Sequence, residues 1–167
     1  MTASISTLDR IDLKILDILQ DDGKISNIKL AEAVNLSATA VLARVQKLMA
    51  DGFILGYEAK LNPDLLGASF VVFVEILLDK TTPNALDEFS EAVVLHPEII
   101  ACHMISGGFD FLVKIRCKDM SEFRHISGQV LWQLPGVKET RSYPVMEVIK
   151  DSQHIHLKST LKIASKK

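Results

Sequence analysis

Several features that mark particular classes of protein are absent from this sequence. It has only two cysteines, Cys102 and Cys117, without the close spacing of a disulfide framework or a zinc site. No apolar run approaches the length of a membrane-spanning helix, and the N-terminal residues MTASISTLDR lack the apolar core of a signal peptide. The sequence therefore predicts a cytoplasmic protein that has no membrane partner and contains buried thiols, although a redox pair is conceivable.

Motifs typical of enzymes are missing as well. The sequence has no P-loop, no nucleophile–base arrangement and no paired carboxylate site. His154 and His156 lie two residues apart, but no third metal ligand occurs at a useful spacing. We therefore expect no catalytic residue, no metal and no cofactor, and we interpret residues 151–167 as a solvated polar tail.

An excess of positive charge is also lacking. The formal net charge is −2, and residues 1–60 contain seven lysines and arginines against eight aspartates and glutamates. Because neutralisation of phosphates supplies much of the affinity for DNA, one copy of this segment would bind DNA weakly. If the protein binds DNA, we expect it to act as a multimer.

Residues 29–52 have the pattern of two helices joined by a tight turn. Asn35 enters the left-handed region at little cost and can end the first helix, and the Ser37 hydroxyl can cap the second. In the second helix Leu42, Val45, Leu48 and Met49 recur at helical spacing and predict a buried stripe. Such a helix pair either presents its second helix to a DNA groove or simply packs in a helical bundle. The residues that lie away from the stripe are the candidate DNA contacts: Ser37, Thr39, Ala40, Arg44 and Lys47.

The segments on either side of this pair complete a small domain. Asp9 can cap an earlier helix whose apolar stripe is formed by Leu8, Ile11, Ile15, Ile18 and Leu19. After the pair, Gly52 and the partly alternating run 53–61 predict a helix end followed by a strand. Three helices and a strand form a winged helix-turn-helix domain over residues 1–61, which a linker over residues 62–69 follows.

Residues 70–150 show a different pattern, in which β-branched and aromatic runs alternate with helical ones. Strands are expected at 70–78, 99–105, 111–117 and 137–149, with helices after Pro83-Asn84 and after the cap Asp119. The first strand is expected to be buried on both faces except at Glu75. The order β-α-β-β-α-β predicts a ferredoxin-like domain, so the fold class is α+β.

Strand parity predicts which side of this sheet meets the helices. In the strand 111–117 the odd-numbered residues are apolar, whereas Lys114 and Arg116 are even-numbered. The second face of the sheet is still too apolar to be left in water, and a second subunit is its simplest cover. The apolar residues expected there are Val71, Phe73, Ala101, Ile105 and Leu112.

Taken together, five segments resemble the Lrp/AsnC family of transcriptional regulators: LDRIDLKILDILQ, LAEAVNLS, RVQKLMADGFILGYEAKLNPDLLG, SGGFDFLVKI and LPGVKETRSY. The resemblance implies a transcriptional regulator with sequence-specific binding to double-stranded DNA and an amino-acid effector. It also implies dimers that pair through their sheets and often assemble into octamers. Ala43 and Gln46 stand where family members usually have basic residues, which favours recognition through DNA shape. The alternative is an amino-acid-binding assembly protein whose helical domain contacts protein.

The resemblance also assigns an effector site. Gly107, Gly108, Phe109 and Asp110 match the family's G-x-x-D motif, in which glycine N–H groups suit a carboxylate and an aspartate suits an ammonium group. On the residues alone, a tight hairpin with an aspartate turn is the competing interpretation. Lys138, Thr140 and Ser142 resemble the second wall of the family's pocket, supplied by a neighbouring dimer.

Overall fold

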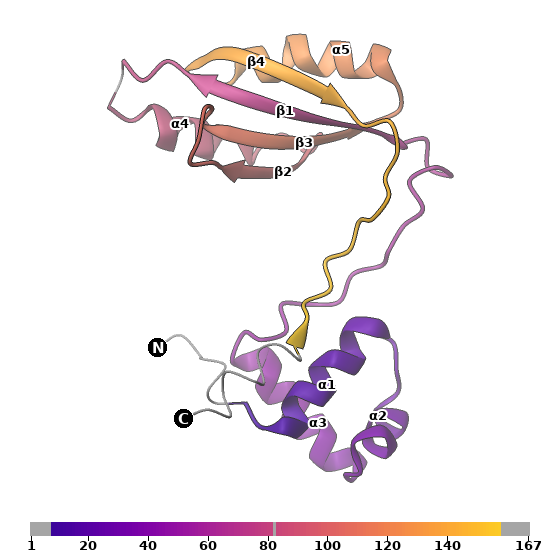
Figure 1. Ribbon diagram of the computed structural model, residues 1–167. Coiled ribbons are helices and arrows are strands. Elements are labelled where there is room, and N and C mark those ends of the chain that lie inside the picture. The colour runs from indigo at the N-terminus through magenta and orange to yellow at the C-terminus, as the bar shows by residue number, and fades with distance from the viewer. Residues whose placement is uncertain (1–7, 82, 158–167) are drawn as a thin grey trace. The chain divides into compact units, whose positions relative to one another are not determined.

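The computed structural model describes residues 8–81 and 83–157, which form two compact units (Figure 1). The N-terminal unit combines the chain up to Lys60 with the residues from Asp151 onward, and the sheet unit spans Leu61–Lys150. The chain therefore leaves the N-terminal unit, forms the sheet unit and then returns. None of the described helices is both long and apolar enough to cross a membrane.

Within its described residues, the N-terminal unit is built on the helices α1 (Arg10–Asp21), α2 (Asn27–Val34) and α3 (Ala38–Ala50). The expected caps are confirmed, since the Asp9 carboxylate accepts hydrogen bonds from the N–H groups of Ile11 and Asp12, and the Ser37 hydroxyl accepts from that of Ala40. Asn35 adopts the left-handed conformation with φ 55°. No other non-glycine residue that the structure describes has a positive φ. The sharp turn between α2 and α3 is thus built into the local sequence.

The buried stripe of α3 differs from the expected one. Val41, Val45 and Leu48 are buried in the core with Ile15 and Leu30, whereas Leu42 and Met49 are 40% and 44% exposed. The prediction that Leu42 and Met49 are buried was wrong because α3 carries apolar residues around most of its circumference. The spacing alone therefore did not determine which side faces inward.

The strand expected over residues 53–61 is absent from the described structure, which contains no strand before Phe70. A strand needs a partner for its backbone hydrogen bonds, and this segment has no partner strand in the part of the chain that the structure describes. Phe53 and Ile54 pack against the core of the N-terminal unit, whereas Leu55 is 97% exposed and Leu61 67% exposed.

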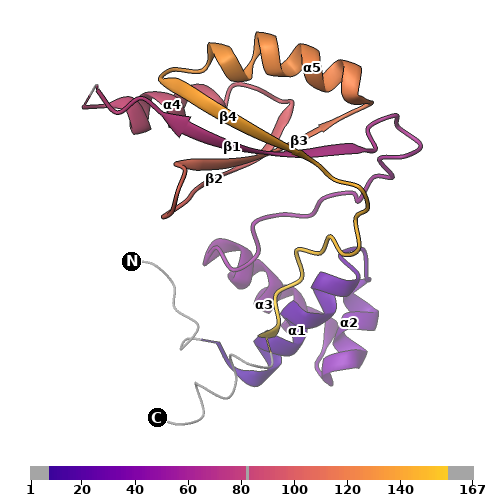
Figure 2. The same ribbon diagram turned by 45° about the horizontal axis from the view of Figure 1, so that its top comes forward.

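The sheet unit has the expected order of elements. They are β1 (Phe70–Leu78), α4 (Ala85–Val93), β2 (Ile99–Met104), β3 (Phe111–Cys117), α5 (Met120–Gln129), the short 3-10 helix η2 (Leu131–Gln133) and β4 (Val137–Pro144). The four antiparallel strands lie in the order β2-β3-β1-β4. Both helices cover one face of the sheet, as Figure 2 shows, and this confirms the ferredoxin-like arrangement.

The core of the sheet unit lies between that face and the helices. Val72, Val74 and Ile76 of β1 are fully buried there, together with Phe89 of α4 and Val113 of β3. The odd residues of β3 face the helices, as strand parity predicted. The second face of β1 is only partly covered within the chain, where Val71 is buried and Phe73 and Leu77 are half-buried, so complete burial of this face by a second subunit stays a prediction.

The sheet face without helices is called the open face below. On β1 and β3 it carries alternate residues that pair in register, Val71 with Arg116, Phe73 with Lys114 and Glu75 with Leu112. The Lys114 ammonium lies 5.9 Å from the centre of the Phe73 ring, within range of a cation–π interaction. On β4, register places Glu139, Arg141 and Tyr143 on this same face.

The described part of the C-terminal tail lies against α1. The Gln20 side chain donates to the Ile155 carbonyl at 3.2 Å and accepts from the Ile155 N–H at 2.7 Å. The His154 ring lies 3.1 Å from the Asp21 carboxylate. Residues 151–156 are exposed, as expected of a solvated tail, and these bonds hold them against α1. Residues 158–167 of that prediction lie outside the described residues.

Candidate functional site

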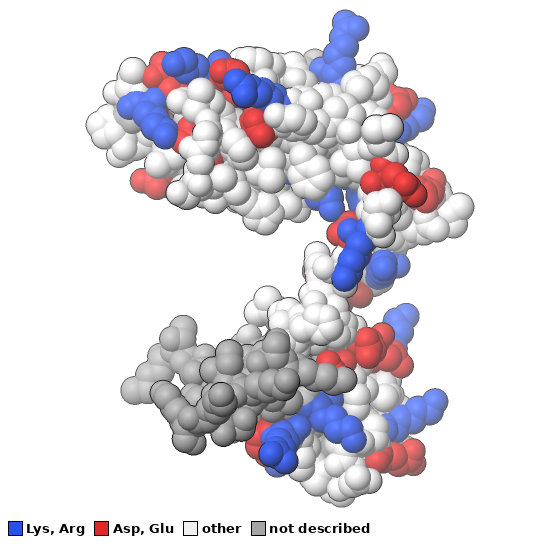
Figure 3. All heavy atoms as spheres, viewed as in Figure 1, with Lys and Arg blue, Asp and Glu red and all other residues white. Residues whose placement is uncertain are grey.

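The surface of α3 supplies few charged groups for nucleic acid. Thr39, Ala43 and Lys47 are exposed, and Ala40 is half-buried. The Ser37 oxygen accepts the Ala40 N–H at 3.2 Å, so this residue shapes the start of the helix. In the view of Figure 3, acidic and basic side chains are interspersed over the N-terminal unit instead of forming one basic patch.

Arg44, another of the residues expected to contact DNA, is engaged within the chain. Its Nη1 atom lies 2.7 Å from Asp9 Oδ2 and 2.6 Å from Asp12 Oδ1. Burial alone would raise the pKa of Asp9, but the hydrogen bonds from the Asp12 N–H and the Arg44 guanidinium hold this pKa below its ordinary value. Arg44 thus has two carboxylate partners within the chain, whereas Thr39 and Lys47 are exposed.

The glycine hairpin between β2 and β3 is held by Asp110. This residue is 7% exposed and is the only polar side chain among the fully buried residues that the structure describes. Its Oδ2 accepts the Leu78 N–H at 2.9 Å, and its Oδ1 lies 2.6 Å from Lys80 Nζ. Its own N–H donates to the Ile76 carbonyl at 2.9 Å. Asp110 therefore fastens the hairpin to the end of β1.

The surroundings of Asp110 keep its carboxylate ionised. Desolvation alone would raise its pKa, but the Lys80 ammonium and the Leu78 N–H hold the pKa below its ordinary value. Each carboxylate oxygen has one partner within the chain, as the hairpin interpretation expects. The expected role of Asp110 toward the ammonium group of a ligand stays a prediction.

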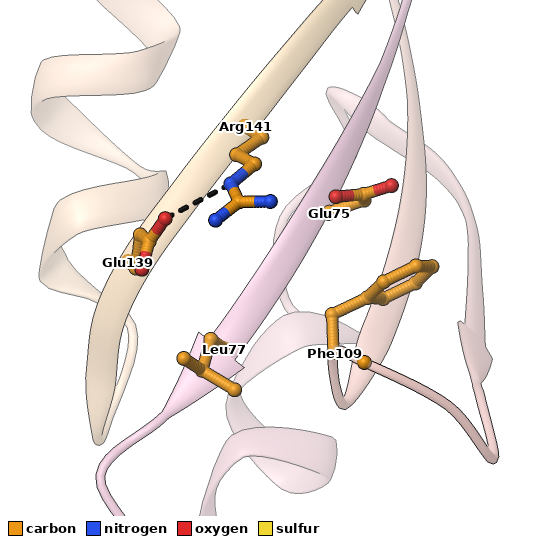
Figure 4. Close-up of a pocket in the computed structure, with 6 residues that line it drawn as sticks. Glu75, Leu77, Phe109, Glu139 and Arg141 are labelled. Carbon is orange, nitrogen blue, oxygen red and sulfur yellow. Dashed lines mark hydrogen bonds and ion pairs between the residues drawn. The ribbon is translucent and has the colours of Figure 1, made fainter.

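A small hollow lies beside the hairpin on the open face (Figure 4). Its volume is about 30 Å³, and it is lined by Glu75, Leu77, Gly108, Phe109, Glu139 and Arg141. The side chains come from β1, β4 and the hairpin. Of these six residues only Gly108 and Phe109 belong to the predicted effector site. A signal for Glu75 was present, because it is the only charged residue in the apolar run 70–78.

Charged groups of both signs meet at this hollow. Glu75 and Arg141 are register partners on β1 and β4, and Arg141 Nε donates to Glu139 at 2.9 Å. That bond raises the pKa of Arg141 above its ordinary value. Desolvation and a hydrogen bond with Glu75 raise the pKa of Tyr143. A carboxylate, a guanidinium and two apolar side chains are the groups needed to bind a zwitterion with an apolar side chain.

Lys138, Thr140 and Ser142 do not join this hollow within one chain. Thr140 and Ser142 pair with Ile76 and Val74, which face the helices, so they lie on the other face of β4 from Arg141. Lys138 is exposed where the register between β1 and β4 shifts. Their assignment to a wall supplied by a neighbouring dimer stays a prediction.

Other reactive side chains do not form a site in the described residues. These residues contain no group of three His, Cys, Asp or Glu suited to a metal ion. Cys102 is half-buried and Cys117 buried, both as free thiols, and desolvation raises the pKa of each. A thiol with a raised pKa is a poor nucleophile at neutral pH.

Comparison with known proteins relates both units to one group. Residues 8–54 match the winged helix-turn-helix DNA-binding domain, and residues 71–155 match the Lrp/AsnC ligand-binding domain. The leucine-responsive regulatory proteins of Escherichia coli and Klebsiella pneumoniae are each 49% identical to this chain over 152 residues. The matches cover 91% of this chain and 93% of each relative.

Solved structures show the same relationship. A transcriptional regulator of Neisseria meningitidis in complex with L-Met superimposes with a TM-score of 0.87 at 30% identity, covering 92% of this chain and 99% of that one. An AsnC family transcriptional regulator of Agrobacterium tumefaciens gives a TM-score of 0.86 at 31% identity, covering 91% and 99%.

Proposed function

The chain belongs to the Lrp/AsnC family of transcriptional regulators, and from this premise we propose that an amino acid bound beside the 105–110 hairpin controls the assembly of its DNA-binding units. The protein is a DNA-binding transcriptional regulator with an amino-acid-binding domain, and it is not an enzyme. A regulator of this kind acts where the DNA lies, so we place it in the cytoplasm.

The hollow on the open face supports the proposal for the effector. Arg141 supplies a guanidinium for the carboxylate of an amino acid, and Glu75, its register partner, supplies a carboxylate for the ammonium group. Leu77 and Phe109 offer an apolar surface for the side chain. The names of the relatives, a leucine-responsive regulator and an L-Met complex, agree with an effector that has an apolar side chain.

Asp110 has an indirect part in this proposal. Its bonds to Leu78 and Lys80 fix the hairpin that carries Gly108 and Phe109. The glycines then present backbone N–H groups beside the hollow, as the G-x-x-D motif suggests. Asp110 therefore shapes the site without touching the ligand.

The hollow within one chain is too small for the whole effector. A volume of about 30 Å³ suffices for about two or three water molecules, since a cavity needs roughly 10–15 Å³ to hold one, so an amino acid needs further walls. We propose that other copies of the chain supply them, with Lys138, Thr140 and Ser142 of a neighbouring dimer among the candidates. A ligand held between copies shifts the equilibrium toward the assembly that binds it better.

The open face supports pairing of two sheets. It carries Phe73 and Leu112 together with charged residues, and a second copy would remove these apolar groups from water. Phe73→Asp should therefore lower the molar mass measured by sedimentation equilibrium, whereas Met120→Asp, an exposed position at the start of α5, should not. An unchanged mass for Phe73→Asp would exclude this pairing. Assembly beyond the dimer, into octamers, is part of the same proposal.

Two measurements on the full chain test the proposed function. In a gel-shift series, a duplex that spans the promoter beside the protein's own gene should be retarded at low salt and released as salt rises. A thermal-shift screen of the twenty amino acids should find at least one that raises the unfolding temperature and changes the retarded species. No retardation at any protein concentration would contradict DNA binding, whereas no amino-acid response would contradict the effector proposal alone.

A further inference from the structure

Arg44 links the second helix of the DNA-binding pair to the start of α1. Its Nη1 lies within 2.7 Å of both Asp9 Oδ2 and Asp12 Oδ1, and its side chain is one-third exposed. The Asp12 side chain is only 15% exposed, so the contact lies between helices and not on the open surface. Arg44 and Asp12 are separated by 32 residues, which makes this a tertiary contact.

The two carboxylates are held by hydrogen bonds that do not involve Arg44. They form the capping box of α1, in which Asp9 Oδ1 accepts the N–H groups of Ile11 and Asp12 at 2.8 Å each. Asp12 Oδ2 accepts the Asp9 N–H at 3.2 Å. Each carboxylate thus uses one oxygen for the cap and offers the other to Arg44. We call these two capped carboxylates, Asp9 and Asp12, the seat of Arg44. Because the cap holds them in place, their ion pairs constrain the orientation of α3, which carries the guanidinium.

Charge makes a direct contact from Arg44 to DNA unfavourable. In the seat two carboxylates surround one guanidinium, so the cluster carries a net negative charge. These carboxylates repel a DNA phosphate that approaches Arg44. Lys47 lies one turn further along α3 and is exposed. A rotation of α3 that released Arg44 would also move Lys47.

We propose that Arg44 is a positioning residue for DNA binding: its ion pairs with Asp9 and Asp12 fix the orientation in which α3 presents Thr39 and Lys47. The inference concerns the DNA-binding function of the chain and does not depend on the effector site. It predicts that the acidic residues Asp9 and Asp12 support DNA binding, although like charges repel phosphate.

The direction in which Asp12→Asn changes the affinity for DNA distinguishes a positioning role of Arg44 from a direct contact with DNA. Asp12→Asn keeps an oxygen for the capping bond but removes a negative charge from the seat. Electrostatics alone predicts tighter DNA binding, and so does an Arg44 that is freed to reach phosphate. Loss of positioning predicts weaker binding. Asp17→Asn, on the same helix but outside the seat, is the matched control for the change in charge.

The experiment measures fluorescence anisotropy of a labelled promoter duplex with full-length protein, well below the unfolding transition of every variant. Asp12→Asn and Arg44→Gln should each weaken binding about three- to tenfold, and the double variant should be no weaker than either alone. Asp17→Asn should bind as tightly as the wild type or more tightly.

The dependence on salt supplies an independent readout. Arg44→Gln should leave the slope of log K against log [salt] unchanged, because a positioning residue neutralises no phosphate. A decrease of about 0.9 per copy would show a phosphate contact and overturn the proposal. Tighter binding by Asp12→Asn would also overturn it. If the variants lower only the unfolding temperature and keep wild-type affinity while folded, the ion pairs serve stability alone and the proposal is wrong.

Discussion

Glu75 and Arg141 lie directly opposite each other in the antiparallel register of β1 and β4. The Arg141 guanidinium also meets Glu139 through Nε at 2.9 Å. One guanidinium therefore stands between two carboxylates at the rim of the hollow beside the hairpin. An incoming carboxylate can use the remaining N–H groups of Arg141, and an incoming ammonium group can use Glu75.

Arg141→Ala should abolish the thermal stabilisation that the amino-acid effector produces. Loss of a charge-assisted pair costs about 1.5–3 kcal/mol, so the apparent Kd for the effector should rise by about tenfold or more. Isothermal titration of the full chain measures this change. Arg124→Ala on α5 is the control, because Arg124 is exposed and outside the hollow. Equal responses from wild type and Arg141→Ala would contradict the assignment of Arg141.

Asp110→Asn should destabilise the sheet unit by about 1–3 kcal/mol, because an amide cannot serve both the Leu78 N–H and the Lys80 ammonium as an acceptor. Urea unfolding followed by Trp132 fluorescence reports on this unit, since Trp132 is the only tryptophan of the chain. Glu91→Gln, an exposed position on α4, is the control. A stability equal to that of the wild type would show that the two bonds contribute nothing.

The same comparison should depend on pH. The pKa of Asp110 is lowered in the folded protein, so ionised Asp110 favours folding above its unfolded pKa of about 4. This contribution is lost as the pH falls through the lowered pKa of the folded state. The stability difference between wild type and Asp110→Asn should therefore be constant near neutral pH and shrink below about pH 4. A difference that grows in acid would contradict the direction of the shift.

Asn35 offers a test of the turn between α2 and α3. Asn35→Ala should cost about 1 kcal/mol because alanine tolerates the left-handed conformation at φ 55° poorly. Asn35→Gly should be neutral or slightly stabilising. Hydrogen exchange of the α2 and α3 amides measures both changes, with the exposed helix position Gln46→Ala as the control. If Asn35→Ala and Asn35→Gly change the hydrogen exchange equally, the left-handed backbone conformation does not explain why asparagine occupies position 35.

Gln20→Ala should weaken the N-terminal unit by about 1 kcal/mol, because it removes both hydrogen bonds to Ile155. Faster hydrogen exchange should appear in α1 and residues 153–157, while the sheet unit keeps its wild-type exchange. Gln129→Ala on α5 is the matched control, since Gln129 is exposed. Uniformly faster exchange in both units would argue against a local contact.

The sequence predicted the ends of helices well where a single residue determines them. Asp9, Ser37 and Asp119 cap helices because their side-chain oxygens reach free backbone N–H groups a few residues ahead. Asn35 ends a helix for an equally local reason. These interactions depend on neighbours in sequence, which is why the sequence alone was enough.

The candidate site was harder to predict because it depends on contacts distant in sequence. β4 reads VKETRSYP and has no apolar alternation, so nothing in it indicated that Arg141 faces the hollow while Thr140 faces the helices. Arg44 looks like a DNA contact by its position on α3, and only the fold reveals its carboxylate partners. Segment 53–61 has strand-like composition but finds no strand to pair with among the described residues.

The pairing of Gln20 with Ile155 has a consequence for synthesis of the protein. These residues are separated by 135 positions, and the whole sheet unit is made between them. At a translation rate of about 5–20 residues per second, α1 emerges from the ribosome roughly ten seconds before its partner segment exists. The DNA-binding unit of a nascent chain therefore lacks its contact with Ile155 until residue 155 has been made, and a chain terminated before that residue carries α1 without this contact.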